Sequence, residues 1–274
     1  MKISINGKNF SEKSAKIPAL DRGLLYGEAV FETMKAINGK VFMIEKHIER
    51  LFHSAKLAAI NPKFSKKVIR NSVYENLKSN NLHDAIVRIT LTGGTGFPKF
   101  TEKSKTSNLI IFSIPFKPYP EKIYLNGVEV KTVKCCRLHS EIKSTDLLPT
   151  ILECRTLSKK YFEALQVDSD GNVLEGLVSN FFAVFGKKIK TPKENVLRGI
   201  TRSAVIDAAK KSGFVVEKNI SLEKVFFADE CFLTKTSAGI VPVVKIDGKK
   251  IAKGKPGKIT KKLIEGFRKI ECKN

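Results

Sequence analysis

Three features in the second half of the sequence suit one kind of chemistry, and the first is a lysine. Lys143 stands in the segment EIKSTDLL, where a predicted strand gives way to a predicted helix. A lysine amine at such a junction can be partly desolvated, which makes it a neutral nucleophile for a carbonyl carbon. The chain holds 50 Lys and Arg residues, so a solvated surface lysine is the alternative for this position.

The second feature is an acidic residue in an apolar setting. Glu175 lies in VLEGLVSNFF, where an ionised carboxylate needs a partner. The protonated nitrogen of a pyridine ring would be a suitable partner, because this charge makes the ring an electron sink for a carbanion at a substrate Cα. A salt bridge to one of the many lysines is the alternative.

The third feature is the segment LRGITR, which leads into a predicted helix. Gly199 lets the backbone approach a ligand closely, and the N–H groups that follow at Ile200 and Thr201 lie at the positive end of the helix dipole. An ordinary helix start capped by threonine is the alternative. Together the three features indicate a site for a phosphorylated aromatic aldehyde.

Several other reaction classes lack their motifs. There is no G-x-S-x-G, H-E-x-x-H or Walker A sequence, and the GGTG at 93–96 lacks the Lys-Ser/Thr of a phosphate loop. The cysteines include no C-x-x-C pair, which argues against zinc and disulfides and favours reduced thiols; they are at 135, 136, 154, 231 and 272. We therefore expect no metal.

The charge and hydropathy of the chain limit where the protein can be located and which partners it can have. No run approaches about 18 apolar residues and the N-terminus lacks the apolar core of a secretory signal, so we expect a cytoplasmic protein that does not enter the membrane. The net charge of +23, densest over 245–273, suggests nucleic acid as an outside alternative. No RNA-binding aromatic pattern, zinc finger or DNA-reading helix accompanies it, which favours a solvated lysine-rich surface.

Strand-like and helix-like segments alternate along the chain, which predicts an α/β or α+β fold. In the first half we predict strands at 2–6, 29–43 with a turn at Asn38-Gly39, 85–91 and 108–116, and helices over 43–60 and 64–79. In the second half we predict strands at 128–136, 214–220 and 230–235, and helices from about Leu147 and over 200–213.

A proline-rich segment, PFKPYP, marks the boundary between the halves. We predict a small N-terminal domain over 1–116, a connector over 117–122 and a larger C-terminal domain over 123–274.

Taken in order, these segments resemble the fold type IV pyridoxal-phosphate (PLP) enzymes. That group includes branched-chain aminotransferases, D-amino-acid aminotransferases and aminodeoxychorismate lyases. The matching blocks are DRGLLYGEAVFETMKAINGKVFMIEKHIERL, EIKS, LEGLVSNFF, LRGITR and TKTSAGIVPV. The resemblance implies a small and a larger α/β domain with PLP between them, and a homodimer whose partner subunit completes the active site.

The resemblance also implies roles for individual residues. Lys143 would form the Schiff base with PLP and move the proton, while Glu175, supported by Asn180, would pair with the ring nitrogen. Leu197 would pack against the ring, and Ser237 and Ala238 would offer backbone N–H groups to the substrate. The residues that would bind the phosphate are Arg50, Gly199, Ile200, Thr201 and Thr236.

The reaction implied is a ping-pong transamination between an α-amino acid and an α-keto acid. The lyase subgroup uses the same cofactor residues to release pyruvate from aminodeoxychorismate, so these residues do not separate the two reactions. An amino-acid aminotransferase is the reaction we favour, with D-amino acids and branched-chain L-amino acids both open as substrates.

Some positions depart from the family pattern, and all concern the substrate. The usual D-amino-acid enzymes carry an Arg-x-His pair where this chain has GGTGFPKF, so the usual carboxylate trap is missing. Arg88 and Lys235 are the cations that we expect to replace it. Phe31 stands where D-specific enzymes often have Tyr, which removes a hydroxyl from the pocket.

Overall fold

The computed structural model describes residues 1–96, 101, 106–211, 213–217 and 219–273. Its contacts divide the chain into two units. One unit consists of Met1–Lys117 with Ile142–Leu147, and the other of Pro118–Glu141 with Leu148–Lys273. Part of the predicted strand at 214–220 and the whole of FPKF (97–100) in GGTGFPKF lie outside the described residues.

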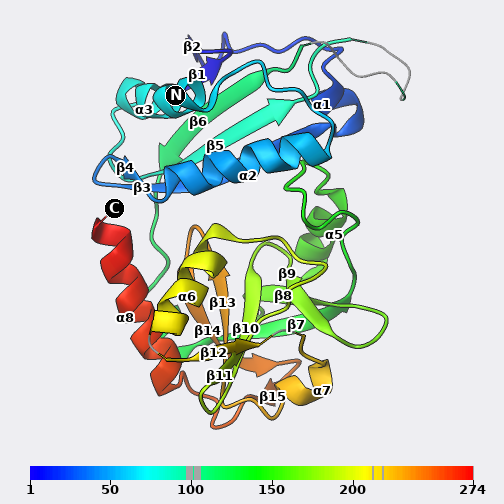
Figure 1. Cartoon of the computed structure of the whole chain (residues 1–274), viewed down its shortest axis with the longest axis vertical. Helices are drawn as coiled ribbons and strands as arrows, with labels where there is room; N and C mark the ends of the chain where they lie inside the picture. The colour runs from blue at the N-terminus through cyan, green and yellow to red at the C-terminus, as the bar shows by residue number, and fades with distance from the viewer. Residues whose placement is uncertain (97–100, 102–105, 212, 218, 274) are drawn as a thin grey trace. The chain divides into compact units, whose positions relative to one another are not determined.

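The first unit is an antiparallel sheet with helices on one face (Figure 1). The strand order is β2-β1-β6-β5-β3-β4. The strands are β1 (Lys2–Ile5), β2 (Lys8–Ser11), β3 (Ala29–Ile37), β4 (Lys40–Val41), β5 (Ala85–Thr92) and β6 (Leu109–Pro115), and the helices are α1 (Arg22–Tyr26), α2 (Ile44–Leu57) and α3 (Lys66–Ser79). The predicted β3–β4 turn is confirmed, with Asn38 and Gly39 both at positive φ.

Alternation along the strands divides the sheet into two faces. On β5, Val87, Ile89 and Leu91 join a buried core with Ile48 and Leu51 of α2 and with residues of α3. The residues between them on β5, among them Arg88, therefore point to the opposite face, as do those that alternate with the core residues of β3, among them Phe31.

The second unit is built around a sheet whose central strands close on themselves. The order is β12-β11-β10-β13-β14-β7-β8-β9, and β9 also pairs with β10. The strands are β7 (Val128–Lys134), β8 (Glu163–Val167), β9 (Val173–Gly176), β10 (Asn180–Phe185), β11 (Lys188–Lys190), β12 (Val215–Glu217), β13 (Glu230–Lys235), β14 (Gly239–Ile246) and β15 (Lys249–Lys250). This closure holds Glu175 directly opposite Asn180.

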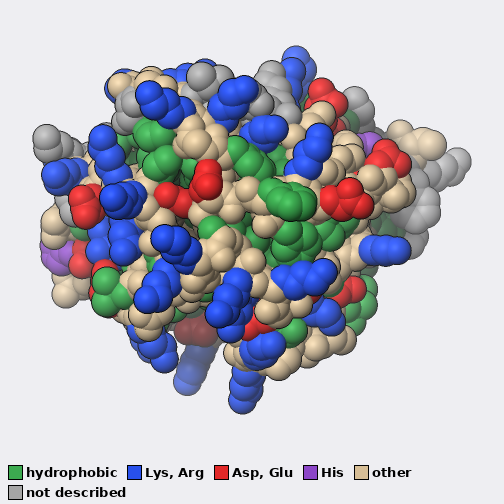
Figure 2. Space-filling model, turned by 90° about the horizontal axis from the view of Figure 1, so that it is seen from below, with side chains coloured by type: hydrophobic (Ala, Val, Ile, Leu, Met, Phe, Trp, Pro, Cys, Tyr) green, Lys and Arg blue, Asp and Glu red, His purple; other side chains and the backbone are tan. Residues whose placement is uncertain are grey.

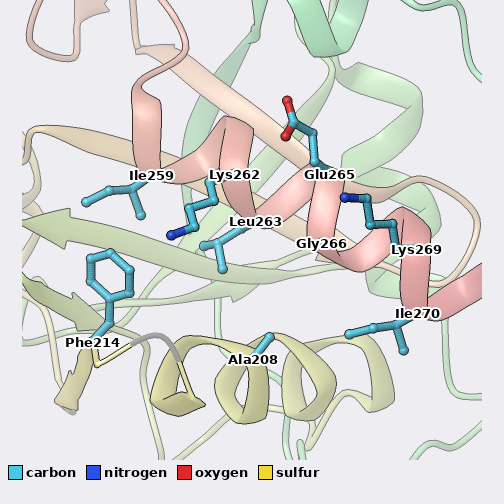
Figure 3. A pocket seen from close by; sticks show the side chains of 9 residues that line it. All are labelled: Ala208, Phe214, Ile259, Lys262, Leu263, Glu265, Gly266, Lys269 and Ile270. Atoms are coloured by element: carbon cyan, nitrogen blue, oxygen red, sulfur yellow. The ribbon is translucent and has the colours of Figure 1, made fainter.

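The helices of the second unit are α4 (Lys122–Asn126), α5 (Leu148–Thr156), α6 (Ile200–Lys211), α7 (Leu222–Val225) and α8 (Lys258–Lys273). Phe182 of β10 stacks on Phe232 of β13 with ring centroids 4.7 Å apart, and both are fully buried. Helix α8 packs beside α6, and a hollow of about 270 Å³ lies between them (Figure 3). Helix α8 was not among the predicted helices, because its many lysines obscure its apolar stripe.

One segment belongs to a different unit from the one we predicted. We expected 142–147 in the C-terminal domain, but its backbone bonds to β3. Phe31 N donates to the carbonyl of Lys143 (2.9 Å), and Thr145 N donates to the carbonyl of Ala29 (2.9 Å). This is the end of β3 that β4 does not cover, because β4 pairs only with Ala36 and Ile37. The segment is therefore grouped with the first unit.

The basic charge is spread over the surface in the view of Figure 2. On that face Lys and Arg side chains alternate with carboxylates and apolar groups and do not gather in one patch. This distribution fits the lysine-rich solvated surface expected from the sequence. Within the described part of the chain, no helix combines the length and apolar character needed to span a bilayer.

Candidate active site

Lys143 lies at the open edge of β3, next to Phe31. Its Nζ is 4.5 Å from the centroid of the Phe31 ring, and its backbone N–H donates to Ser54 Oγ of α2 (3.2 Å). The neighbouring residue, Ser144, forms an antiparallel bridge with Val30. Backbone bonds on both sides therefore fix the position of the lysine along the strand edge.

Arg88 approaches the same aromatic ring. Its guanidinium carbon lies 3.5 Å from the Phe31 centroid, and its Nε donates to Thr90 Oγ1 (3.4 Å). Burial lowers the pKa of Arg88 to about 10, against the opposing charge of Glu32, so the group stays cationic at neutral pH. The first unit thus brings together Phe31, Arg88 and Lys143, which we predicted from separate segments.

Arg50 is held by a buried carboxylate that the sequence analysis did not select. Its Nε donates to Glu32 Oε1 and its Nη2 to Glu32 Oε2, both at 2.7 Å, and His47 Nδ1 lies 2.7 Å from Oε2. Glu32 is fully buried on β3, and His47 is three residues before Arg50 on α2. A signal existed, since Glu32 interrupts the apolar run AVFETM and His47 shares a helix face with Arg50.

The charge state of this group follows from its neighbours. Burial opposes ionisation of Glu32, but the charge and hydrogen bonds of Arg50, with those of His47, lower the Glu32 pKa to about 2. Burial also lowers the pKa of His47, against the opposing effect of Glu32. The pair at neutral pH is therefore a carboxylate and a guanidinium, with a neutral imidazole beside them.

In the second unit, Glu175 is buried and tightly hydrogen-bonded. Its Oε2 accepts from Asn180 Nδ2 (3.0 Å) and from the backbone N–H of Leu197 (2.9 Å). Asn180 Nδ2 also donates to the Leu197 carbonyl (2.8 Å), so the three residues form one network. The other carboxylate oxygen, Oε1, lies 3.8 Å from Arg137 Nη1. Sequence reasoning missed Arg137, whose only signal was a basic residue at the end of a predicted strand.

The network explains the glycine at the start of α6. A Cβ on Gly199 would lie 2.0 Å from Asn180 Oδ1, so a side chain there would displace the residue that orients Glu175. Ile200 and Thr201 follow in the first turn of α6, and both are buried. The predicted neighbours Asn180, Leu197 and Gly199 therefore lie together with Glu175.

The turn between β13 and β14 carries the remaining predicted residues. Thr236 and Ser237 are half-buried and Ala238 is buried. The Ala238 N–H donates to the Lys235 carbonyl (3.3 Å), and its carbonyl accepts from Tyr124 Oη (2.9 Å). Lys235 itself lies beside Glu163, with Nζ 3.8 Å from Oε2.

The predicted site residues thus form two groups, each within one unit. The first unit holds Phe31, Arg50, Arg88 and Lys143, and the second holds Glu175, Asn180, Leu197, Gly199, Ile200, Thr201, Lys235, Thr236, Ser237 and Ala238. The hollow between α6 and α8 is lined by other residues, with Ala208 and Phe214 facing α8 and Glu265 pointing away from α6 (Figure 3).

Side chains that could bind a metal ion do not gather in the part of the chain that the structure describes. There, no cluster of three or more His, Cys, Asp or Glu side chains could hold an ion. Cys135, Cys136, Cys154 and Cys231 are free thiols, and burial raises the pKa of Cys231. The side chain of Cys272 lies outside the described part.

Comparison with known proteins gives one consistent family. The sequence model of the class IV amino-transferases matches residues 29–246. A Methanocaldococcus jannaschii protein, provisionally named as a branched-chain-amino-acid aminotransferase, is 40% identical over 100% of this chain and 97% of its own length. A D-alanine aminotransferase of Staphylococcus haemolyticus is 32% identical over 98% of this chain and 97% of its own length.

A solved structure extends the likeness to the whole fold. The branched-chain amino acid aminotransferase of Escherichia coli superposes with a TM-score of 0.89 at 26% identity, covering 98% of this chain and 93% of that one. The family model covers most of the sequence, and the relatives match it nearly end to end. The chain is therefore an enzyme of the class IV aminotransferase family.

Proposed function

We propose that this enzyme uses PLP to transfer an amino group between an α-amino acid and an α-keto acid, with Lys143 as the residue that bonds the cofactor. The observation that carries the proposal is the buried Glu175 carboxylate, held by Asn180 and by the Leu197 backbone. A buried carboxylate oriented in this way is suited to keep a pyridine nitrogen protonated. Membership of a PLP-dependent family supports the same cofactor.

The donor set in the structure fits PLP. Glu175 supplies a fixed anion for the ring nitrogen, and the first turn of α6, opened by Gly199, supplies backbone N–H groups for a phosphate. Arg50 adds a guanidinium whose orientation Glu32 fixes. When bound, PLP supplies an electron sink for the negative charge that develops at the substrate Cα.

We assign the proton transfer at the substrate Cα to the amine of Lys143. Its backbone is tied to β3 and to Ser54, so the side chain extends from a fixed point. Its Nζ lies over the Phe31 ring, 4.5 Å from the centroid, so the amine at the end of the side chain also has a defined neighbour. Both features suit a group that must alternately bond the cofactor and carry a proton.

For the substrate, we propose an apolar L-amino acid of the branched-chain type. The M. jannaschii relative, matched along the whole chain, supports this class. The stretch GGTGFPKF lacks the Arg-x-His pair of the usual D-amino-acid enzymes. We assign the substrate α-carboxylate to Arg88, which is cationic, half-buried and stacked on Phe31.

The visible spectrum of the purified enzyme tests the cofactor and the substrate together. Titration with L-leucine and L-glutamate should convert the PLP absorbance to that of the pyridoxamine form, because both would donate an amino group. D-alanine and D-glutamate test the opposite hand, and D-glutamate is the mirror image of L-glutamate. If only the D-amino acids convert the absorbance, the substrate is a D-amino acid and the proposed L-amino acid is wrong. PLP absorbance that none of the four changes would favour the lyase reaction, and protein that takes up no PLP would contradict the proposal as a whole.

Arg88→Ala tests the carboxylate role. Loss of a charged hydrogen-bond donor should raise KM for the amino acid by roughly ten- to a hundredfold. The PLP absorbance should stay unchanged, because we place Arg88 on the substrate and not on the cofactor. Arg70→Ala is the matched control, since Arg70 forms a more exposed pair with Glu45 in the same unit. An unchanged KM in Arg88→Ala would exclude this assignment.

Glu32→Gln tests how Arg50 is positioned. The variant should bind PLP about tenfold more weakly, because Arg50 loses a buried, doubly hydrogen-bonded partner. Glu32 has a pKa of about 2 in the folded protein against 4.5 ordinarily, so its contribution to stability is present above pH 4.5 and is lost as the pH falls towards 2. The difference in unfolding free energy between wild type and variant should shrink over that range.

The control for this experiment is Glu45→Gln, which removes an exposed carboxylate from the same unit. Its stability difference from wild type should be small at every pH. If the unfolding free energy of Glu32→Gln equals that of wild type throughout pH 2 to 7, the buried Glu32–Arg50 pair contributes nothing to stability.

We propose that the enzyme is a homodimer with shared active sites, as its family resemblance implies. Several large apolar side chains are exposed to solvent in the single chain, and their burial by a second copy would support a dimer. In the first unit they are Leu20, Leu24, Leu25 and Tyr26, and in the second Leu148, Ile151 and Leu152. Contiguous exposed apolar residues of this kind are typical of protein interfaces.

Leu24→Asp should weaken the dimer, because Leu24 is 64% exposed and its burial by a second copy would be opposed by a charge. Light scattering should give wild type twice the 30.5 kDa chain mass and give the variant a lower mass on dilution. Phe227→Asp is the control, since Phe227 is 82% exposed and lies elsewhere. Wild type at the mass of one chain would refute the dimer.

A further inference from the structure

A second buried carboxylate, Glu163, holds the turn that joins Glu175 to Asn180. Glu163 opens β8 and is 4% exposed. Its Oε1 accepts from the backbone N–H of Val178 (2.7 Å) and from Ser179 Oγ (2.9 Å). Both donors belong to the turn between β9 and β10, so one carboxylate oxygen fixes the connection between the two residues of the Glu175 network.

The surrounding contacts leave this turn little freedom. Gln166 Nε2 donates to the Gly176 carbonyl (3.0 Å), and Leu177 N donates to the Ala164 carbonyl (3.0 Å). A Cβ on Gly176 would lie 2.4 Å from Glu163 Oε1 and 2.2 Å from Ser179 Oγ. The glycine after Glu175 is therefore needed for the close approach of Glu163. Strand β8 fixes the turn through hydrogen bonds made by three of its residues, Glu163, Ala164 and Gln166.

The other oxygen of Glu163 faces Lys235. Nζ of Lys235 lies 3.8 Å from Oε2, and Oε2 has no hydrogen-bond partner within the described residues. The same Nζ lies over two aromatic rings, 5.6 Å from the centroid of Phe162 and 5.9 Å from that of Tyr119. Since the Lys235 side chain is only 16% exposed, its ammonium group is enclosed by one anion and two aromatic faces.

We propose that Lys235 is a positioning residue that acts through Glu163 on the Glu175 turn. In this view the ammonium neutralises the buried carboxylate, the carboxylate holds Val178 and Ser179, and the turn keeps Glu175 in register with Asn180. The inference rests on the proposed function, because Glu175 matters here as the partner of PLP. It gives Lys235 a role different from the substrate cation expected from the sequence.

If Lys235 and Glu163 act as a buried ion pair, the single and double variants should differ in a characteristic way. Removing one partner leaves an uncompensated charge in a poorly solvated place, whereas removing both charges together is often tolerated. Glutamine at 163 keeps an oxygen that can accept from Val178 N and Ser179 Oγ, and needs no counter-ion. The losses of stability and of PLP affinity that follow removal of the Lys235 charge should therefore be reversed when the Glu163 charge is removed as well.

The test is a double-mutant cycle of Lys235→Met, Glu163→Gln and the double variant in the full-length enzyme. Denaturant unfolding without added PLP and the dissociation constant for PLP are measured for each. Lys235→Met should unfold at lower denaturant and bind PLP about tenfold more weakly, and the double variant should recover most of both losses. Glu163→Gln alone should have the smaller effect, because glutamine keeps an acceptor for Val178 N and Ser179 Oγ, and the Lys235 ammonium keeps its contact with two aromatic rings.

Lys160→Met is the matched control. Lys160 pairs with Glu129 in the same unit, with Nζ 3.1 Å from Oε1, and is more exposed. Its loss should leave PLP binding at the wild-type value. This control separates a general effect of removing positive charge from an effect on the Glu175 turn.

Two results would overturn the proposal. One is a Lys235→Met protein that matches wild type in unfolding and PLP binding, including the case in which only KM for the amino acid rises, as a substrate cation would require. The other is a double variant no better than Lys235→Met. Failure of wild type to bind PLP would instead count against the proposed function, and the unfolding cycle would still report on the ion pair.

Discussion

A carboxylate removed from water must be met by hydrogen bonds and positive charge, and much of this protein's local structure meets that requirement at three glutamates. Glu175 is satisfied by a side-chain amide, a backbone N–H group and a nearby guanidinium. These groups meet because β9 pairs with β10, which places Asn180 opposite Glu175, and because the chain after β11 passes Glu175 again at Leu197. The closed path of strands in the second unit is what makes both contacts possible.

The same requirement organises the first unit. Glu32 lies on the helix-facing side of β3, where it accepts two hydrogen bonds from Arg50 and lies against His47. Phe31, one residue earlier, points to the other face and contacts Arg88 and Lys143. One strand thereby supplies an anchor for a cation on one face and an aromatic surface for two cations on the other, because successive side chains alternate.

These buried acids stand out because the chain as a whole is so basic. It has 50 Lys and Arg residues against 27 Asp and Glu, and most of the lysines are solvated. Charge on the surface is screened by salt and contributes little to stability, whereas each buried carboxylate holds its hydrogen-bond partners in one geometry. The unusual net charge therefore says less about the reaction than the position of Glu32, Glu163 and Glu175.

Much of the fold could be predicted because its signals are local. The Asn38-Gly39 hairpin, the apolar stripe of α2 and the start of α6 near Gly199 depend on a few neighbouring residues, and the structure has each of them. The family blocks likewise selected Glu175 and Asn180, which the structure joins in one network. Helix α8 was missed because its lysine content resembles that of a solvated tail.

The sequence by itself determined the order of the elements, the family and the residue types available for chemistry, because these depend on local pattern. Tertiary structure alone decided that the Lys143 segment pairs with β3, that Glu32 holds Arg50, and that Lys235 faces Glu163. Each of these contacts joins residues at least 18 positions apart. No local periodicity encodes which distant group a buried charge will meet, since that depends on how the sheets close.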